Sequence, residues 1–91
     1  MNVQLQPREP SSGELLLVGH TVDQAIDRIE KLLDASLLGE QRTIRLIHGF
    51  GTGQLKKAIF EHLHRHPLVT SVRIATAEEG GGGVTIAELK D

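Results

Sequence analysis

The apolar residues of this chain follow two different spacings, which predict strands and helices in alternation. Four short, mainly apolar runs have the length of strands, and they occupy 14–18, 43–47, 69–75 and 84–89. Two longer segments carry apolar residues three and four positions apart, as on one face of a helix. They run from about 21 to 38 and from Leu55 to Pro67. The predicted order is strand, helix, strand, helix, strand, strand.

Residues typical of helix ends stand at the boundaries of both helical segments. Thr21 followed by Gln24 is the pattern of a capping box, in which each side chain accepts a hydrogen bond from the other residue's backbone amide. Gly39 is a common stop just past a helix. Pro67 has no amide hydrogen and ends the second helix.

Three other segments carry expectations of their own. The run "ELLLV" at 14–18 is continuously apolar after its first residue, which predicts a strand covered on both faces. The glycine-rich segment "TAEEGGGG" at 76–83 is expected to be flexible. Residues 1–13 hold two prolines and no periodic pattern, and we expect a flexible tail or interdomain linker there. A single domain then covers 14–91.

The element order predicts an α/β fold in which helices pack on a small sheet. Strand–helix–strand units favour parallel pairing with right-handed crossovers. Ligands of such sheets tend to bind outside the carboxyl ends of the strands. Two loops of this chain are expected at such ends, namely the turn at Gly19 and His20 and the loop "HGFGTG" at 48–53.

The composition indicates a small globular domain with an aliphatic core. Of its 91 residues, 38% are hydrophobic, and Phe50 and Phe60 are the only aromatic residues. The absence of cysteine excludes disulfides and thiolate zinc sites and favours a cytoplasmic location. Every apolar run is far too short to span a bilayer, so no membrane association is predicted.

The charge of the chain is unevenly distributed, which keeps nucleic acid open as a partner. The net charge is −2. Residues 42–73 nevertheless hold six Lys and Arg side chains, Arg45 among them, against the single acidic residue Glu61. Local potential rather than net charge steers a phosphate chain. An uneven distribution of this size also arises by chance in small domains, so both interpretations stand at this point.

The glycine loop at 48–53 has the chemistry of an anion site. Backbone amides freed at the start of a helix, together with the positive end of the helix dipole, bind phosphate. Thr52 is a candidate cap for the helix, and Lys56 and Lys57 stand in its first turns. Gln54 stands where a nucleotide P-loop would have lysine, so that motif is excluded. The alternative is a tight strand-to-helix turn with nothing bound.

Two side chains of the loop allow a functional and a structural interpretation each. His48 could act as a general base, a proton donor or a phosphate contact, or its ring could bond locally and hold the turn. Phe50 could stack on an exposed base, or it could fold back onto the core.

The histidines of "HLHRH" raise the question of a metal site. His62 and His66 are four residues apart and share a helix face, as zinc ligands do. They also share that face with Leu55 and Ile59, which indicates partial burial. The glutamate usual in a zinc helix is absent, and histidines are favourable near a helix C-terminus in any case. We predict no metal site here.

The chain resembles the Smr, or small MutS-related, domain found at the C-terminal end of MutS2 proteins. The segment "IHGFGTGQLKKAI" fits the family pattern HGxGTGxLxxAI. The segments "HPLVTSVRIA" and "EEGGGGVTIAEL" are similar to its closing portion. The resemblance runs from about Glu14 to Lys90. It implies a two-layer βαβαββ sandwich with a mixed four-stranded sheet and two helices, similar to the C-terminal domain of translation initiation factor 3.

The resemblance also implies nucleic-acid binding and metal-assisted nicking of DNA, with Mg²⁺ or Mn²⁺ as the candidate cofactor. The implied partner is DNA, or else structured RNA or the ribosome, and the implied context is a larger MutS2-like chain. His48 is the candidate catalytic residue. The candidate nucleic-acid contacts are Gly49, Phe50, Gly51, Thr52, Gly53, Lys56, Lys57 and Arg45.

The first strand departs from the family pattern. The family usually reads L-D-x-[HR]-G there, whereas this chain has Leu16 in place of the Asp and Val18 in place of the basic residue. Leucine cannot bind a metal or position a water, and valine cannot hold a phosphate. His20 stands two residues further on. Two hypotheses follow: a nicking endonuclease, and a non-catalytic module that docks on DNA, RNA or the ribosome.

Overall fold

The computed structural model describes residues 13–91. It contains β1 (Glu14–Leu16), α1 (Val22–Leu37), β2 (Thr43–Ile47), α2 (Gln54–His64), β3 (Val69–Ile74) and β4 (Val84–Leu89), with two short 3-10 turns, η2 (Ala77–Glu79) and η3 (Gly81–Gly83), before β4. The predicted order of strands and helices is confirmed. The tail expected at 1–13 lies outside the described residues, except for Gly13.

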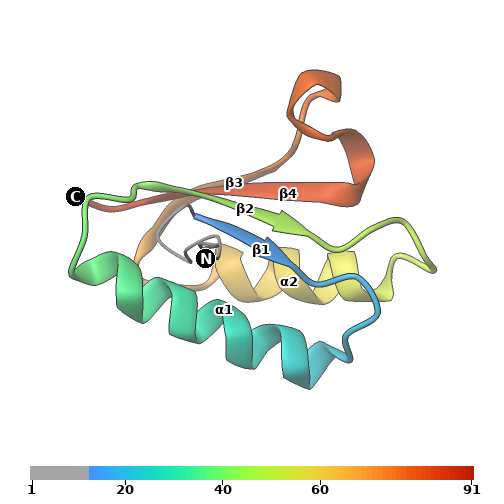
Figure 1. Cartoon of the computed structure of the whole chain (residues 1–91), viewed down its shortest axis with the longest axis horizontal. Helices are drawn as coiled ribbons and strands as arrows, with labels where there is room; N and C mark the ends of the chain where they lie inside the picture. Colours follow the sequence, from blue (N-terminus) through green and yellow to red (C-terminus); the bar gives the residue numbers. More distant parts are fainter. Residues whose placement is uncertain (1–12) are drawn as a thin grey trace, which may run out of the picture.

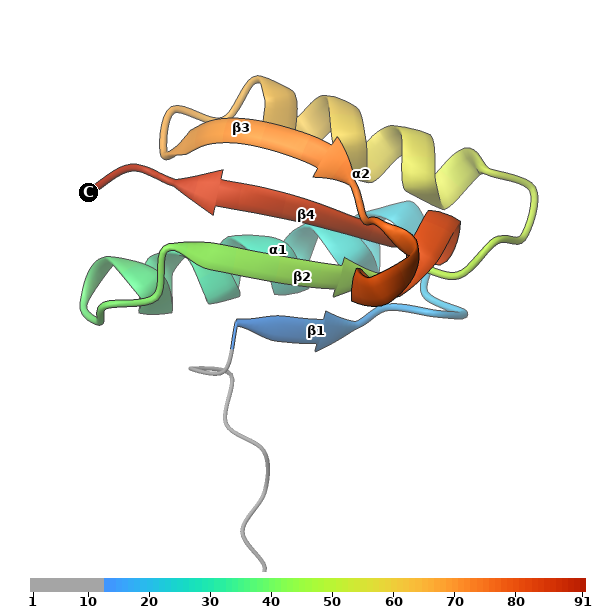
Figure 2. The same cartoon turned by 90° about the horizontal axis from the view of Figure 1, so that it is seen from above.

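The four strands form one mixed sheet in the order β1-β2-β4-β3 (Figure 2). β1 runs parallel to β2, and β4 runs antiparallel to both β2 and β3. Both helices lie on the same face of this sheet (Figure 1). The two-layer α/β sandwich implied by the sequence is therefore confirmed.

The core lies between the sheet and the two helices and is aliphatic, as the composition predicts. The largest fully buried side chains are Leu17, Ile29, Leu33, Ile44, Leu46, Ile59, Leu63 and Thr85. Burying one such aliphatic side chain stabilises a fold by roughly 1.5–3 kcal/mol. None of the helices in residues 13–91 is both long and apolar enough to cross a membrane.

The expectation that the first strand is covered on both faces is wrong. Leu15 and Leu17 face the helices and are buried, whereas Leu16 is 59% exposed and Val18 54% exposed. The physical reason is that both helices cover one face, so an edge strand of this sheet buries alternate side chains only. The regular strand also ends at Leu16, although the amide of Leu17 still donates to the Ile47 carbonyl at 2.7 Å.

The expectation that "TAEEGGGG" is a flexible connection is also wrong. The segment forms η2 and η3, and Thr76 and Glu79 make a capping box around η2. Arg73 of β3 donates two hydrogen bonds to the Glu79 carboxylate, at 2.6 and 2.8 Å. These bonds, together with the one from the Thr76 amide, hold the pKa of Glu79 near 2. An ion pair and a cap thus give this glycine-rich segment a defined turn.

The predicted start of α1 is confirmed, whereas the cap predicted for α2 is wrong. The capping box of α1 is present, with the Gln24 amide donating to Thr21 Oγ1 at 3.1 Å and the Thr21 amide donating to Gln24 Oε1 at 3.0 Å. The cap of α2 is Gly53 rather than Thr52. Thr52 Oγ1 instead accepts a long hydrogen bond of 3.3 Å from the amide of Gln54.

Candidate nucleic-acid interface

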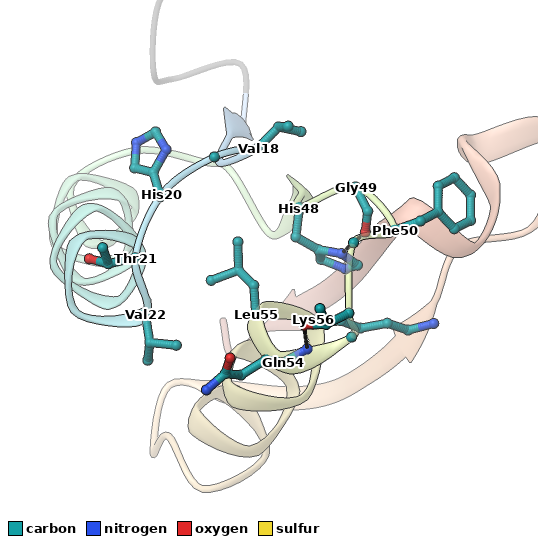
Figure 3. A pocket seen from close by; sticks show the side chains of 14 residues that line it. Val18, His20, Thr21, Val22, His48, Gly49, Phe50, Gln54, Leu55 and Lys56 are labelled. Atoms are coloured by element: carbon teal, nitrogen blue, oxygen red, sulfur yellow. Dashed lines mark hydrogen bonds between the residues drawn. The ribbon is translucent and has the colours of Figure 1, made fainter.

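Two loops meet at one edge of the sheet and enclose a cleft. Because β1 and β2 are parallel neighbours, the loops that follow them leave the sheet on the same side, as predicted. The cleft has a volume of about 480 Å³. In Figure 3, His20 and Thr21 of the first loop and Val22 of α1 lie on one side of the cleft. His48 and Phe50 of the second loop and Lys56 of α2 lie on the other.

The structure brings most of the candidate site residues together in this cleft. Those that line it are His48, Gly49, Phe50, Gly51, Thr52, Gly53 and Lys56. Lys57 lies outside it and borders a shallow neighbouring hollow with Phe60 and Glu61. The wall also includes residues that sequence reasoning did not single out, chiefly Val22 and Leu55. Their helical spacing marked them only as core positions.

Arg45 does not line the cleft. Its Nε donates to the Glu79 carbonyl at 2.8 Å, and its Nη1 pairs with the carboxylate of Glu14. It lies on the face of the sheet that the helices leave open, because its neighbours in β2, Ile44 and Leu46, face the core. Arg45 was predicted to belong to the loop site because of its positive charge, but the charge of a residue does not determine where its side chain points.

The glycine loop presents backbone amides at the start of α2. Gly49, Gly51 and Gly53 have φ angles of 78°, 42° and 88°, a region that other residues rarely adopt. These turns bring the chain from the end of β2 directly into α2. The amide of Lys57 is the first to bond back within the helix, to the Gly53 carbonyl at 2.9 Å. The amides of Leu55 and Lys56 therefore have no partner inside the helix, at its positive end.

His48 is buried beneath the loop, and both of its ring nitrogens have partners. It is 5% exposed. Its Nδ1 lies 2.9 Å from the Gly49 carbonyl, and its Nε2 lies 2.8 Å from Oγ1 of the buried Thr85. A carbonyl only accepts, so Nδ1 carries the hydrogen and the Thr85 hydroxyl donates to Nε2. Burial lowers the pKa of His48. The hydrogen bond to the Gly49 carbonyl raises that pKa and the charge of Lys56 lowers it, and the net shift is downward. The ring is therefore neutral at neutral pH.

Comparison with known proteins shows the family of this chain. The model of the Smr domain family matches residues 15–90. The chain belongs to the Smr domain family. Over 81 residues it is 43% identical to a protein named Endonuclease MutS2 from Listeria innocua, covering 89% of this chain and 10% of the relative. Endonuclease MutS2 from Staphylococcus haemolyticus is 40% identical over 88 residues, covering 97% of this chain and 11% of the relative. The chain thus spans about a tenth of the length of these curated relatives.

Two solved structures share the fold of this Smr domain. The crystal structure of the Smr domain of Thermus thermophilus MutS2 matches with a TM-score of 0.81 and 40% identity, covering 86% of this chain and 98% of that one. YdaL, a stand-alone small MutS-related protein from Escherichia coli, matches with a TM-score of 0.79 over 87% of this chain and 65% of its own. At 19% identity, the second match shows likeness of fold alone.

The wall of the cleft formed by the first loop carries no charge from β1. Val18 lines the cleft, and its side chain faces Gly49 closely enough that a Cβ added there would lie 3.3 Å from Cγ2 of Val18. Leu16 does not line the cleft. Of the two positions at which this Smr domain departs from the family pattern, only Val18 therefore borders the cleft, where it gives an apolar wall in place of a cation.

The donor set of the cleft does not fit a divalent metal held by the protein. Mg²⁺ and Mn²⁺ prefer carboxylate and other oxygen ligands, and none of the residues that line the cleft is Asp or Glu. Both ring nitrogens of His48 are already hydrogen-bonded. No cluster of three or more metal-ligating side chains occurs elsewhere in residues 13–91. No step of the function proposed below therefore passes through Mg²⁺ or Mn²⁺.

His62 and His66 join the two helices rather than a metal. Nε2 of His62 lies 2.5 Å and Nε2 of His66 lies 3.2 Å from the same carboxylate oxygen of Glu30 on α1. Nδ1 of His66 accepts from the Leu68 amide at 3.1 Å, so its Nε2 carries the hydrogen that points to Glu30. Burial by itself raises the pKa of Glu30, but the hydrogen bonds and charges of the two histidines together outweigh it and lower that pKa.

Replacing Glu30 tests this helix-to-helix contact. Glu30→Gln is expected to lower the free energy of unfolding by about 0.5–1 kcal/mol at pH 7, because solvent screens a pair that is partly exposed. A lowered folded-state pKa gives stability that is present above the unfolded value of about 4.3 and is lost as the pH falls through the folded value. The difference between wild type and variant in urea unfolding should therefore shrink below about pH 4.

The exposed Glu61 of α2 supplies the matched control. Glu61→Gln removes the same charge without touching the histidines and should leave stability within about 0.5 kcal/mol. Equal effects of both variants at pH 7 would show that the contact of Glu30 with His62 and His66 adds no stability.

Proposed function

We propose that this Smr domain binds the phosphate backbone of DNA in the cleft between its two loops, as part of a MutS2-like protein. The observation that carries the proposal is the charge of the cleft. Its lining includes Lys56 and no Asp or Glu, in a chain whose net charge is −2. An anion is the ligand that such a lining favours.

The arrangement of donors supports phosphate in particular. The amides of Leu55 and Lys56 in the first turn of α2 have no partner inside the helix. They stand at its positive end, where phosphate is commonly bound. Lys56 is half-buried in the same first turn. Its ammonium adds a formal positive charge to those amides at the wall of the cleft.

Phe50 supports a nucleic acid over a smaller phosphate compound. It is 74% exposed at the rim of the cleft. One edge of its ring lies over Gly82 and Gly83, where an added Cβ would approach the ring to 3.2 Å. An exposed aromatic ring held in this way offers a face on which a base can stack while its phosphate lies in the cleft. The relatives carry the name endonuclease, which also fits a nucleic acid as the ligand.

Removal of the Lys56 ammonium tests the proposal. Lys56→Ala is expected to weaken binding to a short fluorescent DNA duplex roughly five- to tenfold, equally for every sequence tested. The slope of log affinity against log salt should fall by about 0.9 because one phosphate contact is lost. Fluorescence anisotropy over a range of salt concentrations measures both quantities.

Lys90 at the far end of β4 is the matched control, because it is an exposed lysine away from the cleft. Lys90→Ala changes the net charge equally and should alter the affinity much less than Lys56→Ala. Equal effects of the two variants would mean that the affinity for DNA depends only on the net charge of the domain and not on the cleft. Tighter binding of a structured RNA than of the duplex would point to RNA as the partner.

A second candidate function is nicking of DNA, which the position of His48 beside the cleft favours. The curated relatives carry the name endonuclease. In this chain, Nδ1 of His48 donates to Gly49 and Nε2 accepts from Thr85. Only Nε2 has a lone pair for a proton, so the bond from Thr85 must break before the ring can take a proton from a water that attacks a phosphate.

Nicking of supercoiled plasmid by the purified domain, with Mg²⁺ or Mn²⁺ added, tests this second candidate. Cutting by wild type that disappears in His48→Ala but persists in Thr85→Val, which keeps the imidazole and frees Nε2, would support chemistry that depends on the His48 ring. Binding without cutting in all three proteins would mean that the domain is a non-catalytic module that docks on DNA. Cutting that persists in both variants would exclude His48 as the catalytic group.

A further inference from the structure

Arg28 of α1 reaches the end of β1 and is fixed there by two contacts. Its Nη1 donates to the Leu16 carbonyl at 3.0 Å and lies 2.9 Å from Nε2 of His20. His20 is also part of the cleft wall (Figure 3). A guanidinium is thus held at the edge of the cleft. It lies next to the loop in which Val18 replaces the basic residue of the family pattern.

The two contacts determine which hydrogen-bond donors remain available. A guanidinium only donates, so Nε2 of His20 must accept and Nδ1 of His20 must carry the ring hydrogen. The two contacts engage both hydrogens of Nη1. Arg28 retains the hydrogens of Nε and Nη2, and within residues 13–91 it forms no ion pair. That free edge has the fork geometry that matches two oxygens of one phosphate.

The surroundings of Arg28 form a hollow that adjoins the cleft at His20. It has a volume of about 340 Å³ and is lined by His20, Gln24, Asp27, Arg28 and Lys31. His20 belongs to both the hollow and the cleft. Two positively charged side chains, Arg28 and Lys31, and one carboxylate, Asp27, line the hollow. An anion is attracted to Arg28 and Lys31 and repelled by Asp27.

We propose that Arg28 and His20 form a second phosphate subsite, which binds another phosphate of the nucleic-acid strand held in the cleft. The inference rests on the function proposed above, since the cleft supplies the first phosphate site. Arg28 presents its free edge to the phosphate, and Nδ1–H of His20 is a further donor beside it. The strand crosses from the glycine loop over His20 toward α1.

Two substitutions of opposite sign test the subsite. Arg28→Ala should weaken binding to a short fluorescent DNA duplex about three- to tenfold and lower the salt slope by about 0.9. Asp27→Asn should strengthen binding about two- to threefold, because it removes the carboxylate that opposes the phosphate. Arg28→Lys keeps the charge but not the fork, so its affinity should fall between those of wild type and Arg28→Ala.

The same measurements distinguish failure of the subsite from failure of the proposed function. If Lys56→Ala weakens binding while Arg28→Ala behaves like the control Lys90→Ala and Asp27→Asn has no effect, the subsite is wrong and the cleft remains. If wild type does not bind DNA, both proposals fall. If Arg28→Ala also lowers the melting temperature, its weaker binding has a second cause, and the result for Asp27→Asn then tests the subsite. Asp27 is an exposed side chain that forms no ion pair within residues 13–91, so its replacement should leave the fold intact.

Discussion

His48→Ala is expected to lower the free energy of unfolding by about 2–4 kcal/mol. Two losses add up to this value. Removal of a ring that is 5% exposed leaves a cavity beneath the glycine loop. The Gly49 carbonyl and the buried Thr85 hydroxyl each lose a partner as well, and an unsatisfied buried group costs about 1–3 kcal/mol. Urea unfolding at pH 7 measures the effect.

The size of this effect is expected to depend on pH. Because burial lowers the pKa of His48, the unfolded chain takes up a proton below about pH 6.5 that the folded ring does not accept. The stability contributed by His48 is therefore full above that pH and falls as the pH falls toward the folded pKa. The gap between wild type and His48→Ala should narrow between about pH 7.5 and 5.5. A gap that widens over this range would contradict a lowered pKa.

Two other variants separate the role of His48 from a general effect of losing a histidine. His64→Ala removes an exposed histidine from α2 and should change stability by no more than about 0.5 kcal/mol. Thr85→Val keeps the imidazole but removes the hydroxyl that donates to Nε2, and it should cost about 1–3 kcal/mol. Equal unfolding curves for His48→Ala and His64→Ala would show that the ring does not hold the loop.

Gly13→Ala is expected to lower the free energy of unfolding by about 2–4 kcal/mol, because two penalties apply to it. Gly13 has a φ of 75°, which an alanine adopts only with strain. An added Cβ would also lie 2.6 Å from the Thr43 carbonyl oxygen, and backbone cannot move aside cheaply. The Gly13 carbonyl accepts from the Arg45 amide at 2.6 Å, so the clash acts on the point where β1 joins β2.

Gly39→Ala is the matched control for this prediction. An added Cβ at Gly39 meets no atom within 4 Å, and its φ lies outside the left-handed region. The substitution should be neutral or stabilise by up to about 1 kcal/mol, through the unfolded chain. Urea unfolding of the two variants side by side measures the difference. Similar midpoints would mean that β1 shifts to relieve the clash and contributes little stability.

The sequence predicted the elements of this fold well because the signals that encode them are local. The helical spacing of apolar residues located α1 and α2, and the capping box of Thr21 and Gln24 marked where α1 begins. The strand 84–89 has the predicted bounds. The loop 48–53 was recognised because glycines at a strand-to-helix junction form an unusual local pattern, and all of its residues line the cleft.

Other features depend on which segments become neighbours, which no local pattern records. The apolar run at 14–18 has the composition of a strand covered on both faces, yet Leu16 and Val18 are exposed because both helices pack on the opposite face. Arg45 shares the charge of the loop but points to the open face, where it meets Glu14 and Glu79.

The sequence by itself determined the order of the elements, the family and the loop that forms one wall of the cleft. Spacing, caps and glycines act over a few residues, so a single chain displays them. Only the tertiary structure decided the burial of His48 against Thr85, 37 positions away, and the contact of Arg28 with His20 at the end of β1. These depend on the parallel pairing of β1 with β2 and on the helix face that packs against them, and such long-range packing fixes what each side chain can reach.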